Sequence, residues 1–197
     1  FVDPLYPYFL AGIYKLFGHN LEAVRLVQAV IGAASAVLIQ RLGIRLLGGP
    51  GGFLCGMIAA GYRPFIFYDA LLLKSVLKVP FTTLFLFFSV GVLKYGKRLE
   101  ALWAGLFLGL CVLVRGNFLL ILPLAGLAFL FSGKLKGASR LVAATLLLVG
   151  SVAVLVPVAI RNHGISGEWM LTSGFGQNLY IGNHPGNTTG SYVGAPF

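Results

Sequence analysis

Charged side chains are scarce in this sequence of 197 residues, because Asp, Glu, Lys and Arg together make up only 10% of it. Soluble domains average about 25% charged residues. Hydrophobic residues account for 58% of the chain, more apolar surface than one aqueous core of this size buries. The composition therefore excludes an ordinary soluble domain and predicts an all-α polytopic membrane protein.

Acidic residues and cysteines are also few. Five Asp and Glu stand against fifteen Lys and Arg, which gives a net charge of +10. The basic residues are spread between apolar segments instead of clustering on one polar face, so we expect no nucleic-acid partner. Cys55 and Cys111 both lie in apolar runs without disulfide or metal-ligand spacing, and we expect them to be small buried hydrophobic side chains.

What the chain does contain is long apolar runs. A helix needs about 20 residues to cross a bilayer core of about 30 Å. Six segments approach that length, at 21–46, 50–68, 71–93, 99–114, 116–132 and 138–160. Residues 4–17 are too few to span and are rich in aromatic side chains, so we expect an N-terminal interfacial helix there.

These segments predict three parts. Residues 1–20 hold the end of an exterior loop and the interfacial helix, and residues 21–160 form a core of about six transmembrane helices. Residues 161–197 are polar, aromatic and rich in Gly and Asn, which is typical of the start of an exterior, periplasmic domain.

Basic clusters predict the orientation. The three clusters are Arg41 with Arg45, then Lys94, Lys97 and Arg98, and finally Lys134, Lys136 and Arg140. If the segments alternate, all three fall on one side, and the positive-inside rule makes that side cytoplasmic. We therefore expect a multi-pass protein of the bacterial inner membrane with its active site facing the periplasm.

Seven basic residues lie off the cytoplasmic side, where the same rule disfavours them. A lipid phosphate at the outer face would explain such cations, because Lys and Arg are its usual partners. Some have simpler explanations: Arg25 can pair with Glu22 one helical turn away, and Lys15 and Lys78 can reach lipid headgroups. The other four are Arg63, Lys74, Arg115 and Arg161.

Asp69 is the only acidic residue between Glu22 and Glu100. Its carboxylate could act as a base, accept hydrogen bonds from sugar hydroxyls, or serve as the counter-ion of Arg63 or Lys74. The sequence leaves these three alternatives open.

The stretch LVRGNFLLILP (113–123) places a charge inside an apolar run. The segments on either side have 16 and 17 residues, about 25 Å each at 1.5 Å per residue. Gly116 allows a tight reversal, and Asn117 can cap the second helix. We therefore expect Arg115 in a turn at the outer membrane boundary.

Four stretches, in the same order, resemble blocks of a known family. They are PLYPYFLAGIYKLFGHNLEAVRLVQAVIGA (4–33), FIFYDALLLKS (65–75), LVRGNFLLILP (113–123) and IRNHGISGEWMLTSGFGQNLYIGNHPGNTTGSY (160–192). The family comprises the bacterial relatives of protein O-mannosyltransferases and of the lipid A aminoarabinose transferase. These are polyprenyl-phosphate-sugar-dependent membrane glycosyltransferases of the GT-C type.

The resemblance implies that a sugar moves, with inversion, from a polyprenyl-phosphate donor to a lipid, glycan or protein hydroxyl. It implies an acidic general base in the first exterior loop and cations at the lipid phosphate, with a divalent metal as a possible cofactor. The chain looks like a piece of a longer protein, so we expect the base upstream of Phe1 and do not assign it to Asp3. Ser75 departs from the family, in which an acidic residue is common at that position.

By motif match, the resemblance predicts which residues line or support the donor site. These are Asp69, Lys74, Arg63, Arg115, Asn117, Arg161 and Asn162, with Asn178 and Asn183 on the exterior loop. Two other functions stay open. A transporter or flippase of lipid-linked sugars needs the same cations. Many transporters are built from internal repeats, and we find no such repeat in this sequence. A non-catalytic membrane scaffold needs none of these cations.

Overall fold

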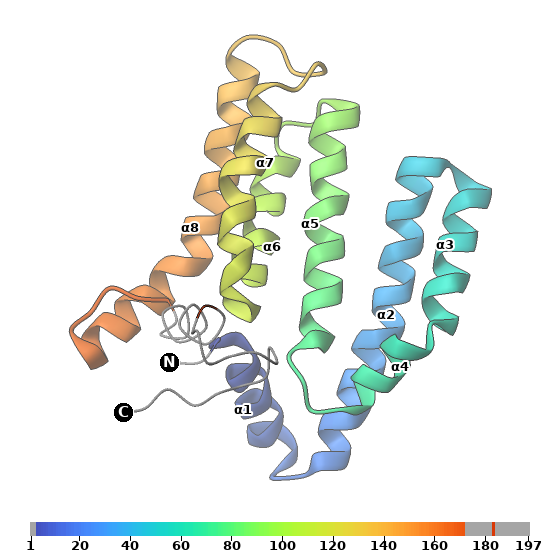
Figure 1. The fold of residues 1–197 in the computed structure, drawn as a ribbon, viewed down its shortest axis with the longest axis vertical. Coiled ribbons are helices and arrows are strands. Elements are labelled where there is room, and N and C mark those ends of the chain that lie inside the picture. The colour runs from blue at the N-terminus through green and yellow to red at the C-terminus, as the bar shows by residue number, and fades with distance from the viewer. Residues whose placement is uncertain (1–2, 172–182, 184–197) are drawn as a thin grey trace.

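The computed structural model describes residues 3–171 and 183, and the regular structure in this part is helical. Figure 1 shows long helices side by side, with short helices at one end. In chain order they are α1 (Leu5–Phe17), α2 (Leu21–Leu47), α3 (Gly49–Gly61), α4 (Arg63–Ala70), α5 (Ser75–Tyr95), α6 (Glu100–Val114), the 3₁₀ helix η1 (Gly116–Leu120), α7 (Ile121–Leu130) and α8 (Ala138–Ser166). The predicted all-α class is confirmed.

Three helices of the described part are long and apolar enough to cross a membrane. They are α2 with 27 residues, α5 with 21 and α8 with 29. Even the shortest reaches about 31 Å, the thickness of the hydrocarbon core. α6 and the stretch Gly116–Leu130 are shorter apolar helices.

The predicted segment 50–68 forms two helices. α3 ends at Gly61, and α4 begins at Arg63 after Tyr62, which has an extended conformation. Pro64 lies in the first turn of α4. Backbone N–H groups of a first turn have no intrahelical acceptor, so a proline, which lacks this group, is well tolerated where a new helix starts. With 13 residues, α3 reaches only about 20 Å, less than the bilayer core.

α6 packs against both α5 and α8. α6 and α8 approach each other closely because a glycine of each helix packs against the backbone of the other helix. A Cβ added to Gly105 would lie 2.1 Å from the carbonyl oxygen of Leu147, and one added to Gly150 would lie 2.3 Å from that of Leu102. Small residues are the usual means by which membrane helices approach each other. The Ser151 hydroxyl donates to the Gly105 carbonyl at 3.0 Å and joins the two helices further.

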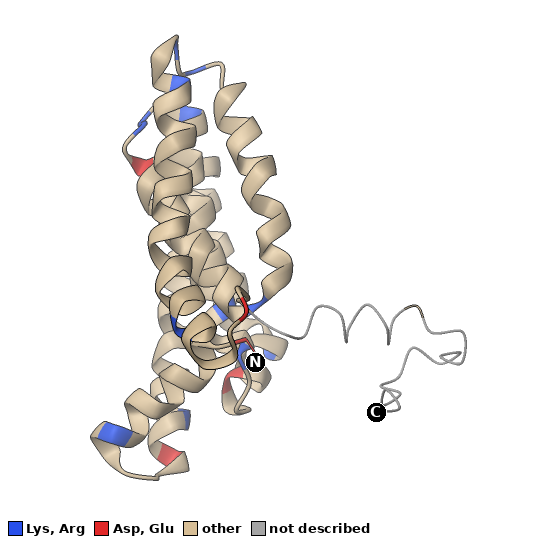
Figure 2. Cartoon of the chain, turned by 90° about the vertical axis from the view of Figure 1, so that its left-hand side faces the viewer, with Lys and Arg blue, Asp and Glu red and all other residues tan. Residues whose placement is uncertain are grey.

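The α2–α3, α5–α6 and α7–α8 connections lie at one end of the structure, which we call the basic end (Figure 1). The three basic clusters belong to these connections and to the helix ends beside them, and Figure 2 shows Lys and Arg gathered at the two ends of the bundle. Arg45 forms a two-fold hydrogen-bonded ion pair with Glu100, with both N–O distances at 2.8 Å. Lys94 Nζ donates to the Arg45 carbonyl at 2.9 Å, which ties α2 to α5.

α1, α4, the α6–η1 turn and the end of α8 lie at the opposite end, which we call the α1 end (Figure 1). α1 corresponds to the predicted helix at residues 4–17, and its Tyr6 and Ile13 side chains are buried. Asn20 caps α2 at this end, because its side chain accepts hydrogen bonds from the backbone N–H groups of Glu22 and Ala23.

The turn between α6 and η1 is built differently from the prediction. Arg115 precedes η1 in an extended conformation, with φ −156° and ψ 112°, and no side chain caps η1. Asn117 lies inside η1, so its predicted role as a helix cap is wrong. Gly116 has no positive φ, and the reversal therefore comes from the extended backbone of Arg115.

Candidate functional site

α1 is the helix around which the predicted cations of the α1 end gather. Its Tyr6 side chain shares a hydrophobic cluster with Val76 of α5 and Val114 of α6. Lys74 stands two residues before Val76, and Arg115 directly follows Val114. Both cations therefore lie next to residues that pack against α1, although 41 positions separate them in the sequence.

Arg161 reaches α1 from the last turns of α8. Its guanidinium carbon lies 5.5 Å from the centre of the Tyr8 ring, within the range of a cation–π contact. The structure thus brings Lys74, just before α5, Arg115, just after α6, and Arg161 of α8 toward the N-terminal half of α1.

Lys74 is paired, but not with Asp69. Its Nζ donates a hydrogen bond to Oδ2 of Asp3, and the two side chains form an ion pair. The Asp3 side chain is 15% exposed and the Lys74 side chain is 44% exposed. An ammonium has three donors, so Lys74 keeps donors for a second anion on its open side.

Gln28 of α2 joins three segments at this end and was not predicted from the sequence. Its side chain is completely buried and accepts a hydrogen bond from the Tyr6 hydroxyl at 3.0 Å. Its Nε2 donates to the carbonyl oxygens of Asp69 at 2.9 Å and Leu71 at 2.7 Å. It thereby holds α1 and the α4–α5 connection, which leads into Lys74. The available signal in the sequence was an amide side chain within an apolar span, which Gln28 shares with Gln40.

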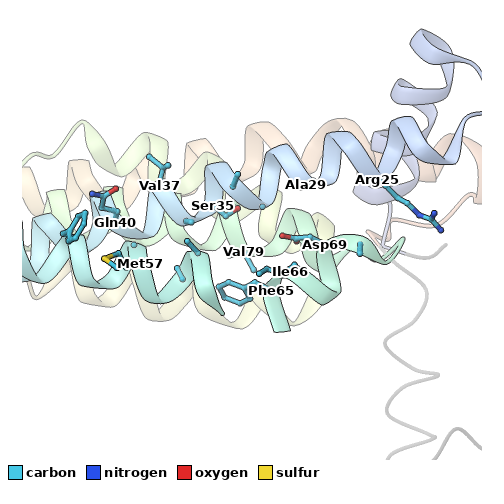
Figure 3. Close-up of a pocket in the computed structure, with 18 residues that line it drawn as sticks. Arg25, Ala29, Ser35, Val37, Gln40, Met57, Phe65, Ile66, Asp69 and Val79 are labelled. Carbon is cyan, nitrogen blue, oxygen red and sulfur yellow. The ribbon is translucent and has the colours of Figure 1, made fainter. Parts of the chain in front are cut away.

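Asp69 lies on α4 and points toward α2 (Figure 3). A Cβ added to Gly32 would lie 1.9 Å from Oδ2 of Asp69, so the carboxylate packs directly on bare backbone. Among the described residues it pairs with neither Arg63 nor Lys74. Burial raises the pKa of the Asp69 carboxyl, since α4 places it between helices without a cation.

Asn162 has a structural role. It is 1% exposed, and its Nδ2 donates to the carbonyl oxygens of Met170 at 3.0 Å and Leu171 at 3.3 Å. Its Oδ1 accepts from Arg161 Nη1 at 3.3 Å. Asn162 therefore folds the segment after α8 back onto the α1 end and helps to orient Arg161.

The other predicted residues within the described part of the chain lie at its surface. Arg63, Arg115 and Asn117 are exposed, and the two arginines form no ion pair within residues 3–171 and 183. Arg63 begins α4 beside the end of α3, away from α1 (Figure 1). Asn183 is exposed, and Asn178 lies outside the described residues.

The arrangement is suited to an anion. Lysine offers a compact point charge and arginine a planar pair of donors, and both are the usual ligands of phosphate. Within the described part of the chain, no group of three or more His, Cys, Asp or Glu side chains could hold a metal ion. The divalent metal stays a prediction.

Comparison with known proteins places this geometry in context. Residues 2–160 match the family described as dolichyl-phosphate-mannose-protein mannosyltransferase. No curated protein and no solved structure matches the chain. The matched range includes α1 to α7 and most of α8. It ends one residue before Arg161, so Lys74 and Arg115 lie within the match and Arg161 lies just after it.

Proposed function

Because the chain belongs to the dolichyl-phosphate-mannose-protein mannosyltransferase family, a family of membrane glycosyltransferases, we propose that it moves a sugar from a polyprenyl-phosphate-linked donor to a lipid, glycan or protein hydroxyl. The observation that carries the proposal is the gathering of Lys74, Arg115 and Arg161 around the N-terminal half of α1.

In this proposal the reaction takes place at the α1 end, on the periplasmic side of the bacterial inner membrane. The eight cations of the basic end would mark the cytoplasmic side by the positive-inside rule. A phosphate bound by the three cations of the α1 end would then lie at the outer headgroup level.

The proposed chemistry is an inverting displacement at the anomeric carbon. The acceptor oxygen forms the new bond, the bond to the phosphate oxygen breaks, and polyprenyl phosphate leaves with its negative charge. Fixed cations stabilise charge that develops on a leaving phosphate. Lys74 and Arg161 fit this task best, because Asp3 and the Tyr8 ring already hold their side chains in place.

Two parts of the proposal concern groups that we do not assign to described residues. The general base that takes the acceptor proton is proposed to be a carboxylate upstream of Phe1, and Asp3 instead positions Lys74. A divalent metal, if the enzyme uses one, would help to neutralise the phosphate.

The test uses the full-length protein in nanodiscs with a radiolabelled polyprenyl-phosphate sugar. We expect the label to leave the lipid and polyprenyl phosphate to accumulate, and we expect Arg161→Gln to slow both. Arg98→Gln is the matched control, because Arg98 is an exposed cation at the basic end. Movement of intact donor across vesicles without loss of sugar would support a transporter and contradict the proposal.

A further inference from the structure

Lys78, one turn into α5, is a half-buried cation without a counter-charge among the described residues. The other half-buried lysines and arginines of this part have partners, namely Glu100 for Arg45, Asp3 for Lys74, and the carbonyl oxygens of Ser132 and Leu135 for Arg140. The Lys78 side chain also forms no hydrogen bond within residues 3–171 and 183. A partly desolvated ammonium without an acceptor costs free energy, so this position favours an anionic ligand.

Lys78 lies across from Arg115. α5 and α6 pack against each other and run in opposite directions (Figure 1). Thr82 Oγ1 of α5 and Cys111 Sγ of α6 are 3.7 Å apart, which sets the register of the two helices. The Arg115 backbone N–H still donates to the Cys111 carbonyl, at 2.8 Å, so Arg115 continues the last turn of α6. One turn from the Thr82–Cys111 contact toward the α1 end therefore leads to Lys78 on one helix and to Arg115 on the other.

The hydrophobic contacts give the same placement. Leu77 and Val114, the residues directly before Lys78 and Arg115, belong to the cluster that packs on α1. Lys74 precedes Lys78 by four positions, which is about one turn, or 6 Å at 1.5 Å per residue, along the same helix face. Lys78 therefore joins the cations around α1 and lies one turn nearer the middle of α5.

This depth selects the kind of anion. α5 is long and apolar enough to span a membrane, and its first turns lie at the α1 end (Figure 1). An anion from water has to leave its hydration shell to reach a cation there. A phosphate that is attached to a hydrocarbon chain is already held at the membrane surface by that chain. The ligand that suits Lys78 is therefore a lipid phosphate.

The leaving group of the proposed reaction is such a phosphate, and its charge increases during the reaction. The donor is a phosphodiester with one negative charge. When the bond to the anomeric carbon breaks, its electron pair stays on the phosphate oxygen, and the product is a monoester. A phosphate monoester has a second pKa of about 6, so the product carries nearly two negative charges at neutral pH.

We propose that Lys78 is a further phosphate-binding residue, which together with Arg115 binds the second negative charge of the leaving polyprenyl phosphate. This inference rests on the proposed function and adds a residue to its site. Asp3 already balances part of the Lys74 charge, whereas the whole charge of Lys78 is free for the ligand among the described residues. Lys78 therefore favours the product state of the phosphate over the donor state.

The test compares two lipids that differ in this second charge. Undecaprenyl phosphate and its methyl ester are titrated against the full-length protein in phosphatidylcholine nanodiscs at about pH 8, where the phosphate is a dianion and the ester a monoanion. We expect the wild type to bind the phosphate at least about tenfold more tightly than the ester, the factor for one hydrogen bond between charged groups. Lys78→Met should remove most of this preference, and Lys78→Arg should keep it.

Lys15→Met is the matched control, because Lys15 is an exposed cation at the last turn of α1, and this variant should keep the full preference. Equal binding of phosphate and ester to the wild type would overturn the proposal. So would an unchanged preference in Lys78→Met, because the added methyl group of the ester, and not the charge, would then cause the difference.

Thermal unfolding without ligand separates binding from a structural role. Lys78→Met should not lower the melting temperature, because it removes a cation that lacks a partner, and added undecaprenyl phosphate should raise the melting temperature of the wild type more than that of the variant. A lower melting temperature of the ligand-free variant would contradict the proposal. Sugar release is measured separately: release without the phosphate preference would refute only the role of Lys78, and the preference without release would refute only the proposed transfer.

Discussion

The Tyr6 hydroxyl donates a hydrogen bond to Oε1 of Gln28 at 3.0 Å, across 22 positions of sequence. This contact joins the interfacial helix to the first long helix in a buried environment. Because the same Gln28 side chain also donates to two carbonyl oxygens of the α4–α5 connection, one amide positions three segments.

We expect Gln28→Leu to lower the free energy of unfolding more than Tyr6→Phe. Tyr6→Phe removes one hydrogen bond, worth about 1 kcal/mol. Gln28→Leu leaves the Tyr6 hydroxyl and the Asp69 and Leu71 carbonyls without their partner, at about 1–3 kcal/mol for each buried group that stays unpaired. Thermal unfolding of the purified variants in one detergent gives the ranking, and equal midpoints would show that Gln28 does not act as the joint.

At the basic end, Glu100→Gln should destabilise the protein by about 3 kcal/mol, because Arg45 would lose its carboxylate in a largely buried place. Both side chains are less than a fifth exposed. Lys97→Gln is the matched control, since Lys97 also contacts Glu100, at 3.5 Å, but is 58% exposed. Exposed pairs contribute about 0–1 kcal/mol. Similar losses in both variants would contradict the importance of the Arg45 pair.

Gly32→Ala should destabilise the contact between α2 and α4. The new methyl group would overlap the Asp69 carboxylate, and overpacking of this kind costs about 1–3 kcal/mol. Gly32→Ala combined with Asp69→Ala should recover most of the loss, because the second change removes the atoms that overlap. Chemical denaturation of the two variants measures the coupling, and a double variant no better than Gly32→Ala would rule out the contact.

Asp69 also makes stability depend on pH. Burial raises its pKa in the folded state above the ordinary value of 3.8, so the folded protein binds this proton more tightly than the unfolded chain. The Asp69 contribution to stability is therefore greatest at low pH and declines as the pH rises from 3.8 through the raised pKa. Asp69→Asn should remove this decline. The difference in melting temperature between variant and wild type, followed against pH, should grow and then level off; a constant difference would refute the assignment.

The pair of Asp3 and Lys74 predicts a non-additive effect on transfer. We expect Lys74→Met to reduce kcat/KM about 100-fold by removing a phosphate-binding cation. Asp3→Asn should reduce it about tenfold by loosening that cation, and the double variant should be no worse than Lys74→Met alone. Additive losses in steady-state kinetics would mean that Asp3 acts independently of Lys74.

The sequence alone was sufficient for the features that depend on local composition. Apolar length located α2, α5 and α8, and the short flanking segments placed Arg115 in a turn. Each follows from bilayer thickness or from backbone chemistry within a few residues. The cap at Asn117 failed because the backbone of Arg115, rather than a side chain, makes the reversal.

Only the tertiary structure decided which polar groups meet. Asp3 binds Lys74 from 71 positions away, and Gln28 reaches Leu71 across 43. The Asp69 carboxylate packs against Gly32 and, within the described residues, forms an ion pair with neither Arg63 nor Lys74. Side-chain spacing along one helix carries no information about such pairs, because they depend on how separate helices pack. Composition and helix length therefore determined the membrane class, whereas helix packing determined which polar and charged side chains come together around α1.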